Sequence, residues 1–437
     1  MSTRKLNLWT AISVVVGCVI GSGVFVKPGR VLVATGDSNL ALLAWLLGGI
    51  ISIAGGLTVA ELASRIPKTG GVYVYMEEIF GKLMGFLCGW VQAIIYGPAL
   101  MSALALYFGS LFVQFFAMPE SSTKPVALIA LFGLSAVTAL STNWSALVQN
   151  ATTFVKLIPI LVLGVAGLAM GDSPIFNIEL AGKPTATGMG VAILATLWAY
   201  DGWIQVANLA EELENPVKNL PRAIIIGLVG TTLVYLLINM SLFHVVPLED
   251  IAVLNEKTAA VAAETIFGSW GGKVIGLGIL IAIFGCLNGN ILTMTRVPYA
   301  MALRNAFPSP QIFSILHPRF QTPVNSIVLK TVIAAGMTIA LNPDRITDIA
   351  LFIMYIFFGL AFVGVILLRK KMGTPGPNEY KVPLYPIVPL IAGFGCLYIC
   401  FSMLTQAPVD ALVSLAVALT GIPVHFWMKR NGKQTLG

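Results

Sequence analysis

Apolar runs of about 20 residues recur along the whole of this 437-residue chain, and they restrict its fold more than any other feature. A run of that length can cross the hydrocarbon core of a bilayer as a helix. Hydrophobic residues make up 57% of the chain and charged residues only 10%, which is too little polar surface for a soluble protein of this size. Barrel strands alternate in short segments of about ten residues, so the pattern predicts an all-α integral membrane protein.

The runs predict twelve transmembrane helices, at residues 7–33, 40–65, 83–116, 124–142, 148–170, 188–210, 221–246, 272–304, 322–341, 346–369, 385–404 and 408–428. A short amphipathic segment, 68–80, is expected to lie at the membrane interface. The first span has no cleavage site of small residues, so we expect it to be retained and not removed as a signal peptide.

Most of the 26 lysines and arginines fall on one side of the membrane in this arrangement. The positive-inside rule then places both termini in the cytoplasm, which agrees with an even number of spans. The net charge of +7 is therefore a topology signal and does not indicate nucleic-acid binding. Lys156 alone remains within the membrane.

Two predicted spans are interrupted by residues that weaken a helix. Gly21-Ser22-Gly23 breaks the first span, and Ala199-Tyr200-Asp201-Gly202-Trp203 breaks the sixth. The breaks fall at matching positions of two consecutive five-helix blocks, and because five is odd the second block is inverted. We therefore divide the chain into two inverted repeats, 1–170 and 171–370, followed by two peripheral spans and a tail, 371–437. Glycines often just allow close helix packing, but two matched breaks favour a transporter binding site.

An interrupted helix exposes backbone groups that hydrocarbon cannot satisfy, so the break must line a cavity or bind a ligand. N–H groups at the start of a half-helix favour an anion, and carbonyls at the end of one favour a cation. An α-amino acid carries both charges a few ångströms apart. Gly21 and Gly23 would let the backbone approach it without a Cβ in the way.

Several motifs together resemble the L-amino acid transporter (LAT) family of the amino acid–polyamine–organocation (APC) superfamily, over nearly the whole chain. They are IGSGVF (20–25), IPKTGGVYVYMEEIFG (66–81), LWAYDGW (197–203), EELENPVKNLPRA (211–223), FGCLNG (284–289) and HPRFQTP (317–323). The resemblance implies the LeuT/APC fold, two inverted five-helix repeats plus two peripheral helices. It also implies sodium-independent obligatory exchange of small neutral L-amino acids (serine, threonine, alanine, cysteine) by alternating access.

The resemblance further implies where the substrate binds. Its carboxylate would meet the N–H groups of Ser22 and Gly23, and its ammonium the carbonyls of Val19, Trp198 and Asp201. The full set of implied substrate-binding residues is Val19, Ile20, Gly21, Ser22, Gly23, Trp198, Ala199, Asp201 and Gly202. Trp198 stands where the family usually has a phenylalanine that gates the site; a larger ring could favour small substrates or rotate away.

Lys156 is the strongest single candidate for a functional residue, because burying an ammonium in the middle of a span costs free energy and such residues are usually functional. The alternative, a lysine that snorkels to the interface, suits Lys330 better. In the family a lysine at this position stands where sodium-coupled relatives bind sodium. The resemblance implies that it bridges the broken first helix near Gly21 to the eighth helix near Cys286, which gives sodium independence.

Other polar residues in the spans have several possible roles. Asp201 could neutralise the substrate ammonium, accept a proton, or cap the second half of the sixth helix. Tyr235 and Tyr355 could line the cavity or stabilise a closed state, although tyrosines in bundles are often simple packing residues.

Three other functions compete with exchange. An intramembrane enzyme would need a catalytic constellation that the three histidines do not form. A channel would need pore-lining rings or a carbonyl filter. A proton-coupled amino acid symporter remains the closest alternative.

The expected partners are neutral L-amino acids and the lipid bilayer of a bacterial inner membrane, with no cofactor and no metal. Animal members bind a heavy subunit through a cysteine after the third span, and residues 116–124 contain none. We therefore expect no disulfide-linked subunit.

Overall fold

The computed structural model describes residues 6–21, 23–176, 186–254, 257–406 and 408–434. Within these residues the chain is helical, with one isolated β-bridge between Leu6 and Leu213. The elements are α1 (Leu8–Val19), α2 (Gly23–Thr35), α3 (Ser38–Arg65), α4 (Val72–Phe80), α5 (Lys82–Val91), η1 (Gln92–Tyr96), α6 (Gly97–Phe115), η2 (Glu120–Ser122), α7 (Thr123–Leu140), α8 (Thr142–Met170), α9 (Ala186–Ala199), η3 (Trp203–Glu212), α10 (Pro216–Val245), α11 (Leu248–Leu254), α12 (Thr258–Met294), α13 (Arg296–Leu303), α14 (Pro310–Phe313), α15 (Val324–Ala340), α16 (Pro343–Met372), α17 (Ile387–Gln406), α18 (Pro408–Leu419) and α19 (Gly421–Gln434).

Nine helical segments in the described residues are long and apolar enough to cross a membrane. The number becomes ten if α1 and α2, which meet at an angle of 41°, form one bent span. The two other predicted spans fall on α15, which is apolar but only 17 residues long, and on the pair α9 and η3. The prediction of an all-helical membrane protein is therefore confirmed.

The eighth predicted span begins earlier than its apolar run suggested. The sequence predicted a start at residue 272, whereas α12 begins at Thr258 and runs across a kink at Gly268, where φ is 72°. Such a φ suits glycine, which has no Cβ to clash. An additional short helix rich in alanine is thus joined to the front of the span.

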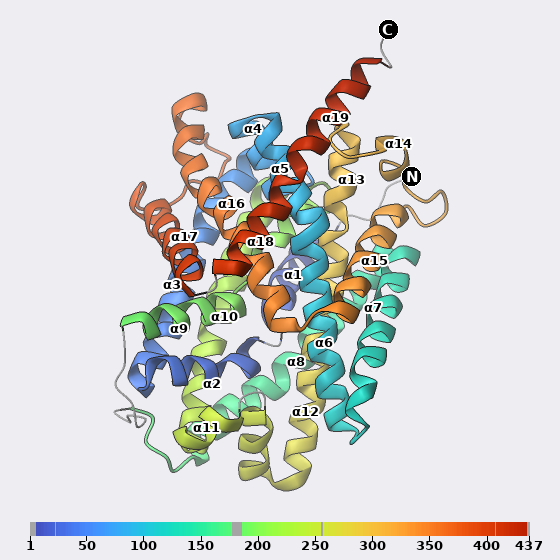
Figure 1. The fold of residues 1–437 in the computed structure, drawn as a ribbon. Helices are drawn as coiled ribbons and strands as arrows, with labels where there is room; N and C mark the ends of the chain where they lie inside the picture. The colour runs from blue at the N-terminus through green and yellow to red at the C-terminus, as the bar shows by residue number, and fades with distance from the viewer. Residues whose placement is uncertain (1–5, 22, 177–185, 255–256, 407, 435–437) are drawn as a thin grey trace.

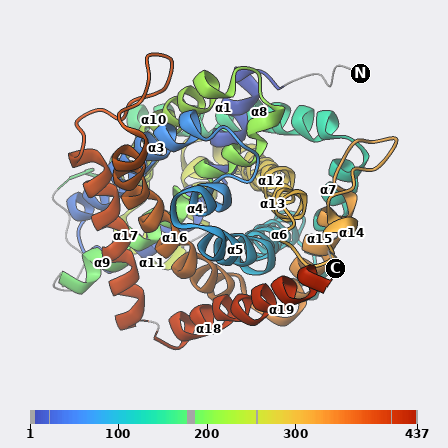
Figure 2. The same ribbon diagram turned by 90° about the horizontal axis from the view of Figure 1, so that it is seen from above.

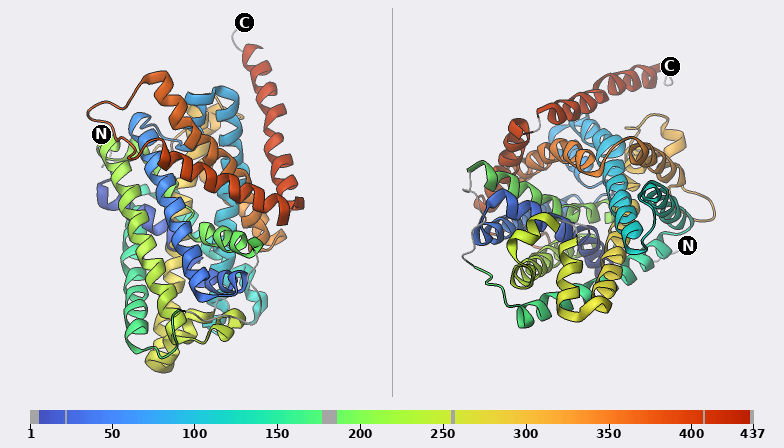
Figure 3. Two further views of the ribbon diagram at one scale, coloured as in Figure 1. Left: turned by 90° about the vertical axis from the view of Figure 1, so that its left-hand side faces the viewer. Right: turned by 60° about the horizontal axis from the view of Figure 1, so that its bottom comes forward.

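The two ends of the helical bundle can be told apart by their short helices. Figure 1 shows α4, α13 and α14 together at one end of the molecule, here called the α4 end, and α11 at the opposite end. Seen from above, α17, α18 and α19 lie at the periphery (Figure 2). The two views of Figure 3 agree that α18 and α19 run along the outside.

Contacts at the α4 end tie the start of α1 to the end of η3. The Leu6 N–H donates to the Glu212 carbonyl at 2.8 Å, and the Glu214 N–H donates to the Leu6 carbonyl at 2.9 Å. The side chain of Glu211 accepts from the Thr69 N–H, and Arg296 forms an ion pair with Glu212 at 2.9 Å. Backbone hydrogen bonds therefore join the segment before α1 to the end of η3, and side chains join the end of η3 to Thr69 and to α13.

Lys330 corrects one expectation. The sequence suggested that it snorkels toward the membrane surface, but its side chain is fully buried between α15 and the π-helical turn η1. Its ammonium donates to the carbonyl of Gln92 at 2.8 Å.

Candidate functional site

The two helix interruptions lie against each other. The first lies between α1, which ends at Val19, and α2, which begins at Gly23. The second lies between α9, which ends at Ala199, and η3, which Gly202 caps with φ of 104°. A Cβ added at Gly23 would lie 2.5 Å from the Cα of Ala199, so only glycine permits this approach.

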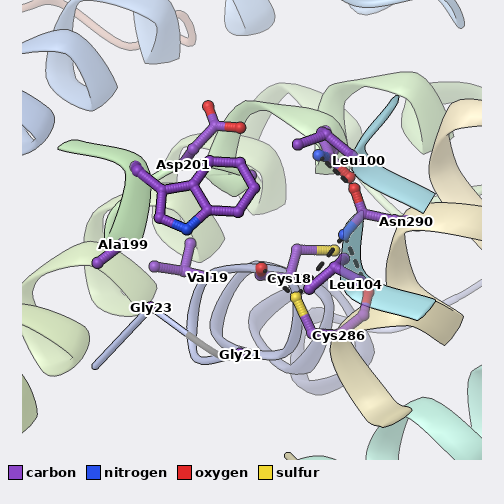
Figure 4. A pocket seen from close by; sticks show the side chains of 13 residues that line it. Cys18, Val19, Gly21, Gly23, Leu100, Leu104, Ala199, Asp201, Cys286 and Asn290 are labelled. Carbon is purple, nitrogen blue, oxygen red and sulfur yellow. Dashed lines mark hydrogen bonds between the residues drawn. The ribbon is translucent and has the colours of Figure 1, made fainter. Parts of the chain in front are cut away.

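A small pocket lies between the interruptions. It is lined by residues of both breaks and of α6 and α12, namely Cys18, Val19, Gly21, Gly23, Leu100, Leu104, Trp198, Ala199, Asp201, Gly202, Gln205, Cys286 and Asn290 (Figure 4). The volume open to the centres of water molecules is about 20 Å³, which is room for one or two waters and not for an amino acid. The pocket is closed in this conformation. Ser22 lies outside the described residues, and Ile20 is buried beside the pocket.

Tyr235 of α10 joins the ends of the two half-helices. Its buried hydroxyl lies 2.9 Å from the carbonyl oxygen of Val19 and 2.8 Å from that of Ala199. A hydroxyl has one hydrogen and can donate to only one of them at a time. The Val19 carbonyl also accepts from the N–H of Gly21 at 2.9 Å.

The neighbouring carbonyls are also engaged. Tyr355 of α16 donates to the carbonyl of Leu197 at 3.3 Å, and the Asp201 N–H donates to the Trp198 carbonyl at 3.1 Å. Of the three carbonyls that the sequence offered to an ammonium, those of Val19 and Trp198 therefore have internal partners in this conformation.

Asp201 is held by a residue that the sequence reasoning missed. Its carboxylate accepts a 2.6 Å hydrogen bond from the hydroxyl of Tyr96, and the backbone N–H of Gly202 also faces it. The N-cap of η3 is Gly202, with no side-chain cap bond. The Asp201 carboxylate therefore has two partners, the hydroxyl of Tyr96 and the N–H of Gly202 at the restart of the helix.

Lys156 is fully buried against the last turn of α1. Its ammonium donates to the carbonyls of Gly17 at 2.9 Å and Ile20 at 2.5 Å. These carbonyls lie at a helix C-terminus, where a cation is favoured. The thiol of Cys286 separately donates to the carbonyl of Cys18 at 2.8 Å (Figure 4), so α8 and α12 each contact α1 through their own bond.

A chain of amides extends the site along α12. The side chain of Gln205 donates to Asn290 at 2.8 Å and accepts from Thr293 at 2.9 Å. Sequence reasoning did not single these residues out, although amides within apolar runs were a visible signal. Beside them, Trp198 is buried, with the ammonium of Lys27 5.9 Å from its ring centre, within the range of a cation–π contact.

Two interrupted helices that meet at a buried pocket in an all-helical membrane protein are typical of secondary transporters. The chain belongs to the amino acid permease family, whose family model matches residues 6–423. It is therefore a multi-pass membrane protein of a family of transporters.

Three relatives show where in this family the chain lies. It is 44% identical to the serine/threonine exchanger SteT of Bacillus subtilis, over 98% of this chain and 97% of that protein. It is 30% identical to the human cystine/glutamate transporter, over 97% of this chain and 85% of that protein. It is 32% identical to the human large neutral amino acids transporter small subunit 2, over 97% of this chain and 80% of that protein.

Proposed function

We propose that this chain is a secondary transporter that exchanges small neutral L-amino acids, such as serine, threonine, alanine or cysteine, without sodium. The observation that carries the proposal is the convergence of the two interrupted helices on one pocket. The names of the relatives support it, because the 44% identical protein is a serine/threonine exchanger. Alternating access around the pocket would be the mechanism.

In this proposal the backbone of the two breaks binds the amino acid. The substrate carboxylate would bind at the start of α2, at the N–H groups of Ser22 and Gly23, where the helix dipole favours an anion. The ammonium would bind the carbonyls of Val19, Trp198 and Asp201. Trp198 would close over the substrate, and the pocket is completed by Ile20, Gly21, Ala199 and Gly202.

Binding then requires a rearrangement around Tyr235. The Val19 carbonyl, which the substrate ammonium would use, accepts from the Tyr235 hydroxyl in this conformation. A bound ammonium would compete with that hydroxyl and release it to Ala199. Opening and substrate binding are thereby coupled through one side chain, and Tyr355 would support the same closed arrangement from α16.

Lys156 would make transport independent of sodium. Its ammonium lies on two carbonyls at the end of α1, which are the kind of ligand that a sodium ion would need. A tethered cation at this place leaves no role for a diffusible one. Cys286, beside Gly21, would complete the contact between the first and eighth spans.

The proposed architecture has twelve spans in two inverted repeats, 1–170 and 171–370, followed by peripheral spans in 371–437. Basic residues such as Arg65, Lys68 and Arg304 lie next to or within the α4 end, which supports a cytoplasmic position for that end and for both termini. The protein would act in a bacterial inner membrane, and without a disulfide-linked heavy subunit, since residues 116–124 contain no cysteine.

The test is uptake of labelled L-serine into proteoliposomes, with and without unlabelled serine inside, in sodium and in choline. We expect uptake that requires internal amino acid and is equal in the two salts. Uptake into empty vesicles driven by a proton gradient would instead establish the proton-coupled symporter. Uptake that rises with sodium would refute the role given to Lys156.

A further inference from the structure

Lys330 is a fully buried lysine that the proposed substrate site does not contact. It lies on α15, and its ammonium donates to the carbonyl of Gln92 at 2.8 Å. Lysine is almost never fully buried without a partner. Within a membrane-spanning bundle an ionisable side chain usually serves function.

The partner of Lys330 belongs to an unusual turn. Residues 92–96 form one π-helical turn, η1, in which the Gln92 carbonyl also accepts from the N–H of Gly97 five residues later. Such turns are rare in proteins, and those that occur are often found at functional sites. The ammonium therefore reinforces the carbonyl that defines the turn.

Gly97 makes room for this ammonium. A Cβ added at position 97 would lie 2.2 Å from the Nζ of Lys330, far closer than real contacts allow. An alanine there would push the ammonium off the carbonyl without removing the lysine. The hydrogen bond between Lys330 and the Gln92 carbonyl can thus be broken by a substitution at Lys330 or at Gly97.

The last residue of the turn is Tyr96, and its hydroxyl donates to Asp201 at 2.6 Å. Each residue of a helix is rotated by about 100° from the one before, so the extra residue of a π turn changes the direction of the side chains around it. If η1 relaxed to a regular α-helix, Tyr96 would no longer face Asp201. The orientation of the Asp201 carboxylate therefore depends on η1 keeping its π-helical form.

We propose that Lys330 is a positioning residue for Asp201. Its ammonium holds the π turn, the turn directs Tyr96, and Tyr96 holds the carboxylate of Asp201, the residue whose backbone carbonyl is proposed to bind the ammonium of the substrate. Lys330 thereby sets substrate affinity without touching the substrate. This rests on the proposed function, because it takes the pocket at Asp201 as the amino acid site.

The first test measures exchange of L-serine in proteoliposomes for Lys330→Met, Gly97→Ala, Tyr96→Phe and the double variant Lys330→Met/Tyr96→Phe. We expect each single variant to raise KM about tenfold, which is the loss of one hydrogen bond to a charged group. The double variant should be no worse than Tyr96→Phe alone, since both act through one path. Lys330→Arg, which keeps a donor, should recover part of the affinity.

Lys124→Met is the matched control. It removes another lysine that donates to a carbonyl of α15, that of Ile339, but at an exposed place away from the pocket. Its KM should stay within twofold of the parent. If Lys330→Met and Gly97→Ala also stay within twofold, or if the effects of Lys330→Met and Tyr96→Phe multiply in the double variant, the proposal is wrong.

A second readout needs no substrate. Unfolding temperatures in detergent for Lys330→Met, Tyr96→Phe, Asp201→Asn and their pairs should show coupled, non-additive losses. Additive losses would overturn the path from Lys330 to Asp201. If the parent exchanges no amino acid, the proposed function fails, while this measurement still decides whether Lys330 and Asp201 are linked.

Discussion

Replacing Tyr235 with phenylalanine should open the pocket more often. The hydroxyl of Tyr235 reaches the carbonyls of Val19 and Ala199 at 2.9 and 2.8 Å. The Val19 carbonyl keeps the N–H of Gly21 after the change, so the Ala199 carbonyl bears most of the loss. A lost buried hydrogen bond costs about 1–2 kcal/mol, which corresponds to a roughly 5- to 30-fold shift in a two-state equilibrium.

The thiols of Cys18 and Cys286 report this opening directly. Both line the pocket and are only 3% exposed, so alkylation requires the pocket to open. In a background with Cys88, Cys396 and Cys400 changed to alanine, Tyr235→Phe should raise the rate of maleimide labelling about tenfold. Saturating L-serine should slow the labelling in both proteins.

Tyr355→Phe is the matched control for this measurement. It removes a longer bond, 3.3 Å, to the Leu197 carbonyl of the same helix end. Its labelling rate should rise by less than about threefold, because a long hydrogen bond is weak. Equal rates for the parent, Tyr235→Phe and Tyr355→Phe would refute the view that Tyr235 holds the pocket closed.

Three further outcomes follow from other contacts. Lys156→Met should lower the initial rate of serine exchange more than tenfold, since it leaves two carbonyls of α1 unpaired; a rate near that of Lys124→Met would contradict this. Arg369→Gln should cost about 2–3 kcal/mol in thermal unfolding, because it removes two hydrogen bonds to the fully buried Glu61, which keeps only the N–H of Val382 and a 3.9 Å ion pair with Arg65. Arg345→Gln, from an exposed pair with Asp410, should cost about 1 kcal/mol or less. The hydrogen bond from Lys68 lowers the pKa of Glu78 below its usual value of 4.5, so this pair stabilises the folded protein at neutral pH and loses its effect only as the pH falls below that value. The difference in unfolding temperature between the parent and Glu78→Gln should stay constant from pH 7 to about pH 5 and shrink at lower pH; a difference that stays constant down to about pH 2 would count against it.

The positions of the helix breaks could be predicted from sequence because their cause is local. Gly21, Gly23 and Gly202 weaken a helix wherever they occur, and the apolar runs around them are long enough to make the interruption visible. Most span boundaries were predicted to within a few residues, but three helices begin earlier than predicted: α8 at Thr142 instead of 148, α10 at Pro216 instead of 221, and α12 at Thr258 instead of 272, where an alanine-rich segment continues the helix across Gly268.

The contacts that hold the site could not be predicted, because they join residues far apart in the chain. Tyr96 lies 105 positions from Asp201, and no local pattern marks residues 92–96 as a π turn. The burial of Lys330 likewise depends on α15 lying against that turn, whereas hydropathy alone suggested a surface lysine. Tyr235 was a candidate by position, but its double contact with Val19 and Ala199 is a result of tertiary packing.

The bridge between Leu6 and Leu213 has a practical consequence for handling the protein. Two backbone hydrogen bonds of Leu6 fasten the segment ahead of α1 to the end of η3, so a bulky or rigid fusion placed directly before Leu6 would pull on both broken helices at once. An affinity tag or fluorescent protein that follows α19, a peripheral helix (Figure 2), would pull on neither of the broken helices. Kinetic comparisons between variants are therefore best made with the tag placed after α19.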